Sequence, residues 1–430
     1  MARKMKDSGI EWIGEIPEGW EIKRLGAILQ ERNEVNNPIQ TTSILSLTNN
    51  RGVIPYSEKG NQGNKAKDDL TGYKIAHIGD IVLNSMNVII GSVGLSNYYG
   101  AVSPVYYMLF PRNNIETNIQ YYNYLFQTTA FQQSLRGYGN GILEIRMRIQ
   151  MQKLKTVLLP VPTFLEQSNI TVYLDASLSK LNILLSKIRS SIEEYKKLKQ
   201  AVITQAVTKG VRGEREMKDS GIEWIGEIPK EWVIQKIKSI SSRINVGVVI
   251  RPSEYFDENG TVPFLRGINV KEYLISSDNM VYINESSNHI LSKSQVHTDD
   301  ILIVRDGSIG TSCVVPAEYD GANVVSMVIV TPSTSCDSRF ICYSLNSDVG
   351  KTQFTLTKIG SALTHTSVSA VSDIIVAVPS CTEQKEIANY LDAKCTEIDK
   401  LIAKKEQLVK ELESYKKSFI YEVVTGKREV

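Results

Sequence analysis

Basic and amide side chains gather on several polar stretches in the first half of the chain. Arginine and lysine can hydrogen-bond to guanine, and asparagine and glutamine to adenine, when a loop carries them into a groove of a duplex. Residues 136–155 also hold the densest run of positive charge in this half, which suits phosphate groups. These considerations give ten candidate contact residues: Asn50, Arg51, Asn64, Lys65, Lys67, Arg136, Tyr138, Asn140, Arg146 and Arg148.

The second half of the chain has fewer cations, and they are more dispersed. Residues 217–375 carry 13 basic and 18 acidic side chains, a net charge of −5. A domain of that charge must bind a polyanion through a local patch. Three short stretches supply the candidates, which are Arg266, Asn269, Lys271, Arg305, Lys358, Ser361, Thr364 and His365.

Several of these residues also have an ordinary structural interpretation, and both interpretations stay open here. Residues 1–160 contain 15 asparagines, which suits adenine recognition but is equally expected from an AT-rich genome. Arg146 and Arg148 can simply flank a helix, and Arg305 can pair with Asp306 in a turn.

The sequence offers little that could catalyse a reaction. The four histidines at 77, 289, 297 and 365 lack the spacing of metal ligands, and no NPPY or NPPF tetrapeptide of adenine methyltransferases occurs. Residues 350–352 resemble the end of a phosphate-binding loop, but Leu345 stands where its leading glycine should be. We therefore expect no catalytic residue, no metal site and no cofactor bound by this chain.

Composition places the chain among average globular proteins. Its 430 residues are 42% hydrophobic and carry 49 basic and 47 acidic side chains, a net charge of +2, and residues 1–160 carry +4. The five cysteines form no CxxC pair, which favours a reducing compartment. No apolar run approaches the roughly 20 residues that cross a bilayer. These features predict a cytoplasmic protein without a membrane partner.

An internal repeat organises the sequence. Residues 5–17 and 217–229 are both MKDSGIEWIGEIP, and Trp20 and Trp232 follow at the same offset. A second match joins 160–167 to 377–384, and the tetrapeptide YLDA recurs at 173–176 and 390–393. The chain is thus a duplicated domain whose ends match while its middles diverge; duplication for stability alone is the other interpretation. We expect the Trp-containing segments to pack against helix ends.

Each half closes with a long amphipathic stretch. Apolar residues recur there at steps of three and four, the period of a coiled coil. Each stretch predicts a helix of about 35 residues, roughly 50 Å long. Pairing of the two helices, antiparallel in a pseudo-twofold arrangement, is the simplest way to cover both stripes; separate docking of each on its own domain is the alternative. The expected seam residues are Leu178, Leu181, Leu185, Ile188, Ile192, Tyr195, Ile398, Ile402, Leu408, Leu412 and Tyr415.

The remaining sequence predicts two mixed α/β domains. Short β-rich runs at 81–83, 88–90, 105–110 and 156–159 predict strands in the first domain, and those at 301–304, 324–330 and 374–378 predict strands in the second. Helical patterns occur at 120–133 and 338–347. The expected boundaries are 1–160 and 217–375 for the two domains, with 161–216 and 376–430 as the coiled-coil helices.

Two divergent domains of about 160 residues, each opened by SGIEWIGEIPxxW and closed by VPxxxEQ, YLDA and a long helix, resemble a known family. The pattern is similar to the specificity subunit (HsdS) of type I restriction-modification systems, and it covers essentially the whole chain. The resemblance implies a fold of two tandem α/β target recognition domains joined by an antiparallel two-helix coiled coil.

The resemblance also implies a function and a set of partners. Each target recognition domain would recognise one half of a bipartite, asymmetric site in double-stranded DNA. The helix pair would set the spacer and dock two modification subunits that methylate adenine with S-adenosylmethionine. Restriction subunits would add translocation and cleavage with ATP and Mg²⁺.

Three other hypotheses remain open on the residues alone. The chain could be a self-contained methyltransferase or nuclease, which methyl transfer by the purified chain would support. It could be a scaffold that does not bind DNA, built on a helical hairpin. It could also belong to a fused restriction system with a different set of partners, which the neighbouring reading frames would decide.

Overall fold

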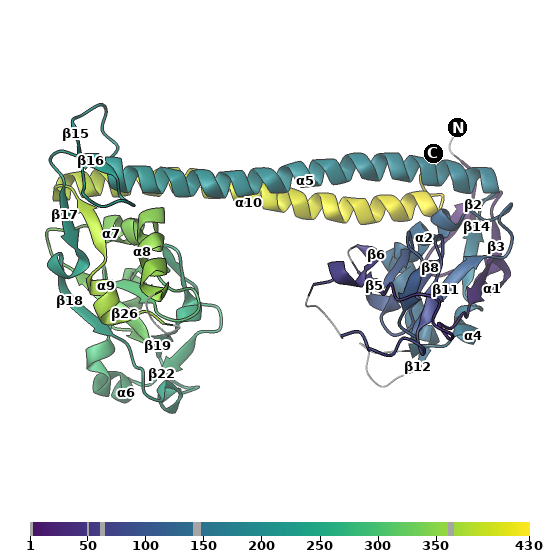
Figure 1. Cartoon of the computed structure of the whole chain (residues 1–430), viewed down its shortest axis with the longest axis horizontal. Helices are drawn as coiled ribbons and strands as arrows, with labels where there is room; N and C mark the ends of the chain where they lie inside the picture. Colours follow the sequence, from purple (N-terminus) through teal and green to yellow (C-terminus); the bar gives the residue numbers. More distant parts are fainter. Residues whose placement is uncertain (1–2, 50, 61–64, 141–147, 360–364) are drawn as a thin grey trace. The chain divides into compact units, whose positions relative to one another are not determined.

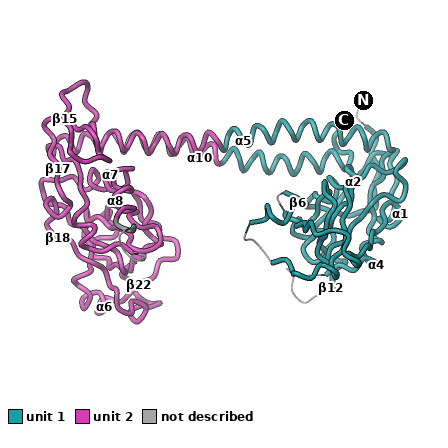
Figure 2. Tube along the Cα trace, viewed as in Figure 1, with its two compact units in different colours: residues 1–189, 407–430 teal, residues 190–406 magenta. Residues whose placement is uncertain are grey.

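The computed structural model describes residues 3–49, 51–60, 65–140, 148–359 and 365–430. The chain divides into two compact units, one formed by residues 1–189 with 407–430 and the other by 190–406 (Figure 2). Below, lobe one denotes residues 1–160 and lobe two residues 217–375.

Lobe one is built around a four-stranded antiparallel sheet in the order β4-β11-β8-β9. Its strands are β4 (Leu29–Arg32), β8 (Ile81–Asn84), β9 (Val93–Leu95) and β11 (Tyr106–Pro111), and helices α2 (Ile119–Gln127) and α3 (Thr129–Ser134) follow. Both helices begin at a side-chain cap, from Asn118 and Thr128. The smaller elements are β1 (Met5–Asp7), β2 (Glu15–Pro17), β3 (Glu21–Arg24), α1 (Leu25–Ile28), β5 (Leu45–Thr48), β6 (Gly52–Pro55), β7 (Lys74–Ala76), β10 (Gly100–Val102), β12 (Gly139–Asn140), β13 (Arg148–Ile149), α4 (Met151–Leu154) and β14 (Leu158–Val161).

Lobe two repeats this plan, with the sheet order β18-β26-β23-β24. Its strands are β18 (Ser241–Val246), β23 (Ile301–Val304), β24 (Ser312–Val314) and β26 (Met327–Pro332), followed by α7 (Ser338–Asn346) and α8 (Asp348–Ile359). The smaller elements are β15 (Met217–Asp219), β16 (Glu227–Pro229), β17 (Val233–Lys236), β19 (Val262–Leu265), β20 (Val270–Lys271), β21 (Leu274–Ile275), β22 (Val281–Ile283), α6 (Glu285–Ile290), β25 (Asn323–Val324), α9 (Val368–Ser372) and β27 (Ile375–Val378). The mixed α/β class and the internal repeat expected from the sequence are confirmed.

Most of the predicted strands are present, with two differences. Residues 88–90 form a 3-10 helix instead of a strand, because they bend away from the sheet and end at Gly91 with a φ of 97°. The run 324–330 is divided between β25 and β26, since Ser326 lies in the left-handed region with a φ of 51° and breaks the strand. Hydropathy alone does not distinguish a bent apolar run from a straight one.

Two long helices, α5 (Phe164–Lys209) and α10 (Cys381–Val424), lie side by side along their lengths in both units (Figure 1). They have 46 and 44 residues, longer than predicted, because each begins directly after its Val-Pro segment. In unit one Asn182 meets Lys416 and Arg189 meets Glu413, and in unit two Lys199 meets Asp399. Rising numbers on α5 face falling numbers on α10, so the antiparallel pairing is confirmed.

The seam between the helices is only partly apolar. Leu178, Leu185, Ile188, Ile192, Ile398 and Ile402 are buried, and Leu181, Tyr195 and Leu412 are half-buried. The predictions for Leu408 and Tyr415 were wrong, since their side chains are 41% and 49% exposed. In residues 403–418 of α10, the inward positions are 405, 409, 412 and 416, of which 405 and 416 are lysines.

Both of these lysines make polar contacts at the seam. Lys416 donates to Asn182 Oδ1 at 2.8 Å, and burial lowers its pKa. Lys405 Nζ lies 5.5 Å from the ring centre of Tyr195. A long aliphatic stem allows a lysine to cover apolar surface while its ammonium stays hydrated, so a sequence search for apolar residues misses it.

Each lobe holds the beginning of one long helix and the end of the other. In unit one, Trp20 is fully buried and donates to Glu166 Oε1 at 3.2 Å at the start of α5. Tyr421, near the end of α10, donates to the carbonyl of Trp12 at 2.9 Å. In unit two, the end of α5 joins the core that contains Trp232. The prediction that the Trp-containing segments pack against helix ends is confirmed.

The glutamine of each Glu-Gln pair fixes the helix start to its lobe. Gln167 accepts from the backbone N–H of Asn118 at 2.8 Å and donates to the carbonyl of Pro162 at 2.9 Å. Gln384 makes the matching bonds to Asp337 N and Pro379 O, at 2.9 and 3.0 Å. Both side chains are buried, so these hydrogen bonds are shielded from water.

The aspartate of each YLDA segment provides a second attachment. Asp175 accepts from the hydroxyl of Tyr124, and Asp392 accepts from Tyr343 at 2.8 Å. Burial, together with the neighbouring carboxylate, raises the pKa of both tyrosines. The motifs that the two halves share are therefore the residues that join each lobe to its helix.

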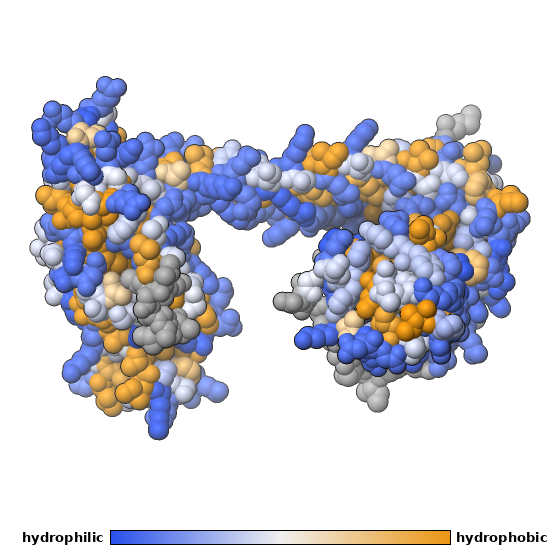
Figure 3. Space-filling view, in the orientation of Figure 1, coloured by the Kyte–Doolittle hydropathy of each residue, from blue (hydrophilic) through white to orange (hydrophobic). Residues whose placement is uncertain are grey.

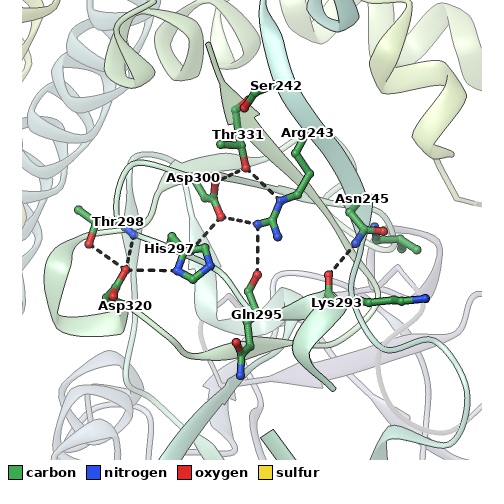
Figure 4. A network of polar contacts seen from close by, with 11 residues as sticks. Ser242, Arg243, Asn245, Lys293, Gln295, His297, Thr298, Asp300, Asp320 and Thr331 are labelled. Carbon is green, nitrogen blue, oxygen red and sulfur yellow. Dashed lines mark hydrogen bonds and ion pairs between the residues drawn. The ribbon is translucent and has the colours of Figure 1, made fainter. Parts of the chain in front are cut away.

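A buried aspartate organises one corner of each sheet. In lobe two, Asp300 accepts from Arg243 Nη2 at 2.8 Å and from the backbone N–H of His297 at 2.9 Å (Figure 4). Arg243 also donates from Nε to Thr331 Oγ1 at 3.1 Å. In lobe one, Asp80 accepts from Arg32 Nε at 2.9 Å and from the N–H of His77 at 2.9 Å. Each lobe thus contains an equivalent pair of a buried aspartate and an arginine.

Replacement of this aspartate should destabilise lobe two. Asp300→Asn leaves the guanidinium of Arg243 without its counter-charge and should lower the free energy of unfolding by about 2 kcal/mol, less than for a fully buried pair because Arg243 is one-third exposed. Urea denaturation followed by circular dichroism measures the change. Glu216→Gln, which breaks the exposed pair with Lys230, is the control and should stay within about 0.5 kcal/mol. Equal effects of the two variants would contradict the role given to Asp300.

An apolar residue at the polar seam position should strengthen the helix pair. Lys416→Leu removes a partly desolvated ammonium and adds buried apolar surface, so we expect the unfolding free energy to rise by about 1 kcal/mol. Leu408→Ala, at an exposed position of the same helix, should leave it nearly unchanged. Thermal denaturation of both variants tests the seam, and a destabilised Lys416→Leu would show that the lysine is needed there.

Within the described residues, no helix combines the length and the hydropathy that crossing a membrane would require.

Candidate nucleic-acid interface

One backbone hydrogen bond recurs in both lobes and fixes a predicted contact segment to a turn of the sheet. In lobe one, the N–H of Ile149 donates to the carbonyl of Ser85 at 3.0 Å. In lobe two, the N–H of Thr366 donates to the carbonyl of Arg305 at 3.1 Å. In lobe one, the segment before β14 is thus fixed to the turn after the central strand β8. In lobe two, the segment before β27 is fixed to the turn after β23. We call this pair of hydrogen-bonded segments the frame. In lobe one the frame carries the side chains of Ser85 and Arg148, and in lobe two it carries those of Arg305 and His365.

Most of the described candidates in lobe one reach solvent. Lys65, Lys67, Arg136 and Arg148 are exposed, and Tyr138 is half-buried against the core. Arg148 belongs to strand β13 and lies shortly before the short helix α4, as the interpretation that it flanks a helix expects. Asn140 lies in β12, which pairs with β13. The predicted residues Asn50, Asn64 and Arg146 lie outside the described residues.

A hairpin beside the edge strand carries Arg51. Strands β5 and β6 form this hairpin, and Gly52 approaches Gly94 of β9 so closely that a Cβ on Gly94 would lie 2.9 Å from the Cα of Gly52. Asn49 accepts from Ser92 Oγ at 2.6 Å and holds the turn. Arg51 pairs with Glu58, so a ligand would compete for its guanidinium.

The candidates of lobe two divide into exposed and engaged residues. Lys271 is exposed and His365 is half-buried. Arg305 donates from Nε to the carbonyl of Thr366 at 3.0 Å, which adds a side-chain bond to the recurring backbone contact. Its partner is this carbonyl and not Asp306, which instead accepts from Ser326 at 3.5 Å. Lys358 lies in α8, whereas Ser361 and Thr364 lie outside the described residues.

The structure does not support Asn269 as a contact residue. Its side chain is fully buried and donates to the carbonyls of Ser276 and Asp278 at 3.1 and 2.9 Å. It also accepts from the N–H of Arg266 at 3.1 Å. Arg266 itself donates to the carbonyl of Asn279, so both residues shape the loop 266–279 from within. An amide in a polar loop gives no sequence signal that distinguishes these roles.

The turn between β8 and β9 is a part of the candidate interface that the sequence did not single out. It connects to β13 through Ser85 and to the β5–β6 hairpin through Ser92. Its counterpart in lobe two contains Arg305. The available signal was the match of Gly91-Ser-Val-Gly94 with Gly307-Ser-Ile-Gly310, which marks the same turn in both halves.

Two of the four histidines pair with carboxylates. His77 pairs with Glu34 at 2.7 Å and His297 with Asp320 at 3.7 Å. Among the described residues, no group of three or more histidine, cysteine, aspartate or glutamate side chains is placed to hold a metal ion. Burial raises the pKa of the Cys313 thiol to about 12, which keeps that thiol protonated and unreactive.

The fold and the paired loops define a class of protein: duplicated α/β lobes that share one frame but present different polar side chains, joined to two antiparallel helices. Comparison with protein families identifies this class. Residues 17–194 and 229–413 match the type I restriction modification DNA specificity domain, and the chain belongs to this family. The resemblance found in the sequence is confirmed, and the chain is a DNA-specificity component, a non-catalytic part of such systems.

Relatives of known family extend the match to nearly the whole chain. The putative type I restriction enzyme MjaX specificity subunit of Methanocaldococcus jannaschii is 26% identical, over 96% of this chain and 95% of the relative. The MjaVIII specificity subunit of the same organism is 24% identical, over 96% and 93%.

Solved structures show the same fold. A chain from a study of complex assembly and conformational transition of the type I R-M system superposes with a TM-score of 0.73 at 13% identity, covering 96% of this chain and 99% of that one. The HsdS subunit of Thermoanaerobacter tengcongensis gives 0.53 at 15% identity, covering 96% and 98%.

Two neighbouring substitutions should distinguish a residue that stabilises the loop 266–279 from one that is exposed on its surface. Asn269→Ala leaves two carbonyls without a donor and should lower the unfolding free energy by about 2 kcal/mol. Lys271→Ala, two residues away and exposed, should not change stability. Thermal denaturation measures both, and a stable Asn269→Ala protein would return this residue to the candidate interface.

Proposed function

We propose that this chain recognises a bipartite, asymmetric DNA site for a type I restriction-modification complex, with lobe one contacting one half and lobe two the other. The observation that carries the proposal is the hydrogen bond that recurs at Ile149 and Thr366, because it holds different side chains on one frame. A common frame with different side chains suits two readers of the same kind of ligand with different base sequences.

The proposed contact surface of lobe one comprises Lys65, Lys67, Arg136, Tyr138 and Arg148, together with Arg51 once it is released from Glu58. That of lobe two comprises Lys271, Arg305 and His365. Lysines suit phosphate contacts, which give affinity without sequence preference, and arginine on a tethered loop suits a base edge. Asn50, Asn64, Asn140, Arg146, Lys358, Ser361 and Thr364 belong to the proposal by sequence alone.

The paired helices act as a spacer and as a docking surface in this proposal. Two modification subunits bind there and methylate adenine with S-adenosylmethionine, while restriction subunits supply ATP- and Mg²⁺-dependent cleavage. The functional boundaries are 1–160, 161–216, 217–375 and 376–430, and the complex acts in the cytoplasm. The chain itself contributes the choice of sequence and no bond-making step.

The decisive experiment maps methylated adenines in cells that contain this chain with its modification partner. We expect a split motif with a fixed spacer, and replacement of residues 1–160 by another such lobe should change only one half of it. A continuous motif, or a swap that alters both halves, would contradict the proposal. Methyl transfer by the purified chain alone would instead favour an enzyme.

Arg148 and His365 occupy equivalent positions in the two lobes. Substitution of either residue should weaken recognition of only one half-site. Arg148→Ala should weaken binding of the assembled complex about tenfold and relax the half recognised by lobe one, while His365→Ala should affect only the other half. Competition binding with half-site variants measures this. Lys23→Ala, on β3, is the control for loss of charge alone and should leave both halves intact.

A further inference from the structure

The β20–β21 hairpin of lobe two presents one cation and one apolar side chain on the same face. Lys271 and Leu274 are directly opposite each other in the antiparallel register, and so are Val270 and Ile275. Opposite residues in such a pair point to the same side of the ribbon. Val270 is buried and Ile275 half-buried in the core beneath, whereas Lys271 is exposed and Leu274 is 54% exposed. The outer face of the hairpin is therefore the pair Lys271 and Leu274.

The hairpin is held firmly at its turn. The N–H of Tyr273 donates to the carbonyl of Ser312 at 3.0 Å, and its ring packs against Tyr343 with centres 4.8 Å apart. Tyr273 has a φ of +69°, which is unfavourable for a bulky residue and is maintained by these contacts. Glu272 pairs with Lys351 of α8 at 2.8 Å.

The base of the hairpin is equally well fixed, by the buried amide of Asn269 and its bonds to the carbonyls of Ser276 and Asp278. A ribbon held at both ends can place an outward side chain at a defined position on a ligand.

The chemistry of this face fits a base pair that contains a methyl group. B-DNA accepts a two-stranded ribbon in its major groove, and there only thymine among the four bases displays a methyl group. Within the described residues, the side chain of Lys271 makes no hydrogen bond or ion pair, so its ammonium is available to a phosphate or a base acceptor next to Leu274. Figure 3 shows apolar patches among polar ones on the face of lobe two that it presents.

The net negative charge of lobe two makes a close contact from the β20–β21 hairpin more important for binding. With a net charge of −5, lobe two gains little from phosphate attraction and depends more on close contacts in the groove. In lobe one, the β5–β6 hairpin closes with the pair Thr48 and Gly52, and Arg51 lies in its turn. No large apolar side chain stands at the described end of that hairpin.

We propose that Leu274 contacts the methyl group of a thymine in the half-site recognised by lobe two. Lys271 binds a phosphate or a base acceptor beside that thymine. This inference rests on the proposed function and specifies one base of the site. It makes the C5-methyl group itself, and not only the hydrogen-bond pattern of the A·T pair, a determinant of recognition.

The test uses the complex of this chain with its modification subunits and a duplex that carries the mapped motif. Each thymine of both half-sites is replaced in turn by uracil, which removes only the methyl group. We expect one replacement, in the half-site of lobe two, to weaken binding about three- to tenfold. In the Leu274→Ala complex, thymine and uracil at that position should bind equally.

Ile290→Ala, at an exposed apolar position on α6 of the same lobe, is the matched control and should keep the preference for thymine. A half-site of lobe two without thymine, uracil replacements that all bind like thymine, or a preference that survives in Leu274→Ala would each overturn the inference. These results leave the split motif intact. Absence of a split motif would instead overturn the proposed function.

Discussion

The attachment of each lobe to the beginning of a long helix depends on one buried glutamine. Gln167 and Gln384 are the residues through which two quite different α/β domains hold the same kind of helix. Each glutamine links a backbone N–H of the lobe to the carbonyl of the proline before the helix. These bonds fix the first turn of the helix relative to the lobe. Because these bonds are buried, a change of either partner would leave a polar group unsatisfied, and the surrounding sequence has little freedom.

This constraint explains why the two halves agree at their ends and differ between them. The shared motifs comprise the buried tryptophan, the Glu-Gln pair and the aspartate that accepts a tyrosine hydroxyl. In lobe one, burial alone would raise the pKa of Glu166, but hydrogen bonds from Trp20, Arg3 and Thr163 hold it below its ordinary value. The carboxylate stays charged and keeps its partners. Residues that lie outside these attachments, such as the loops on the β8 and β23 turns, can vary without loosening the lobe from its helix.

The sequence was sufficient for the architecture and for most of the elements. An exact repeat, regular heptad spacing and alternating apolar runs each depend on few residues and leave clear patterns, so the lobes, the long helices and the central strands were predicted. The seam of α10 was partly missed because Lys405 and Lys416 occupy inward positions while Leu408 and Tyr415 face solvent. The site was predicted less well. Whether Asn269 points into a loop or out of it depends on carbonyls seven and nine residues away, and local composition does not contain that information.

The two lobes also distribute their cations differently, and this bears on how each could hold DNA. In lobe two, Arg243 is committed to Asp300, Arg339 to Asp337 and Asp392, and Arg305 to a backbone carbonyl. Arg243 and Arg339 therefore build the domain and contribute little to its outer field, while the side chain of Arg305, within the described residues, is bonded only through its Nε. Lobe one keeps Lys65, Lys67, Arg136 and Arg148 exposed on its loops. Phosphate attraction falls with added salt whereas apolar contact does not, so a complex of this construction would rely on lobe one for much of its electrostatic affinity and on close groove contacts for the discrimination made by lobe two.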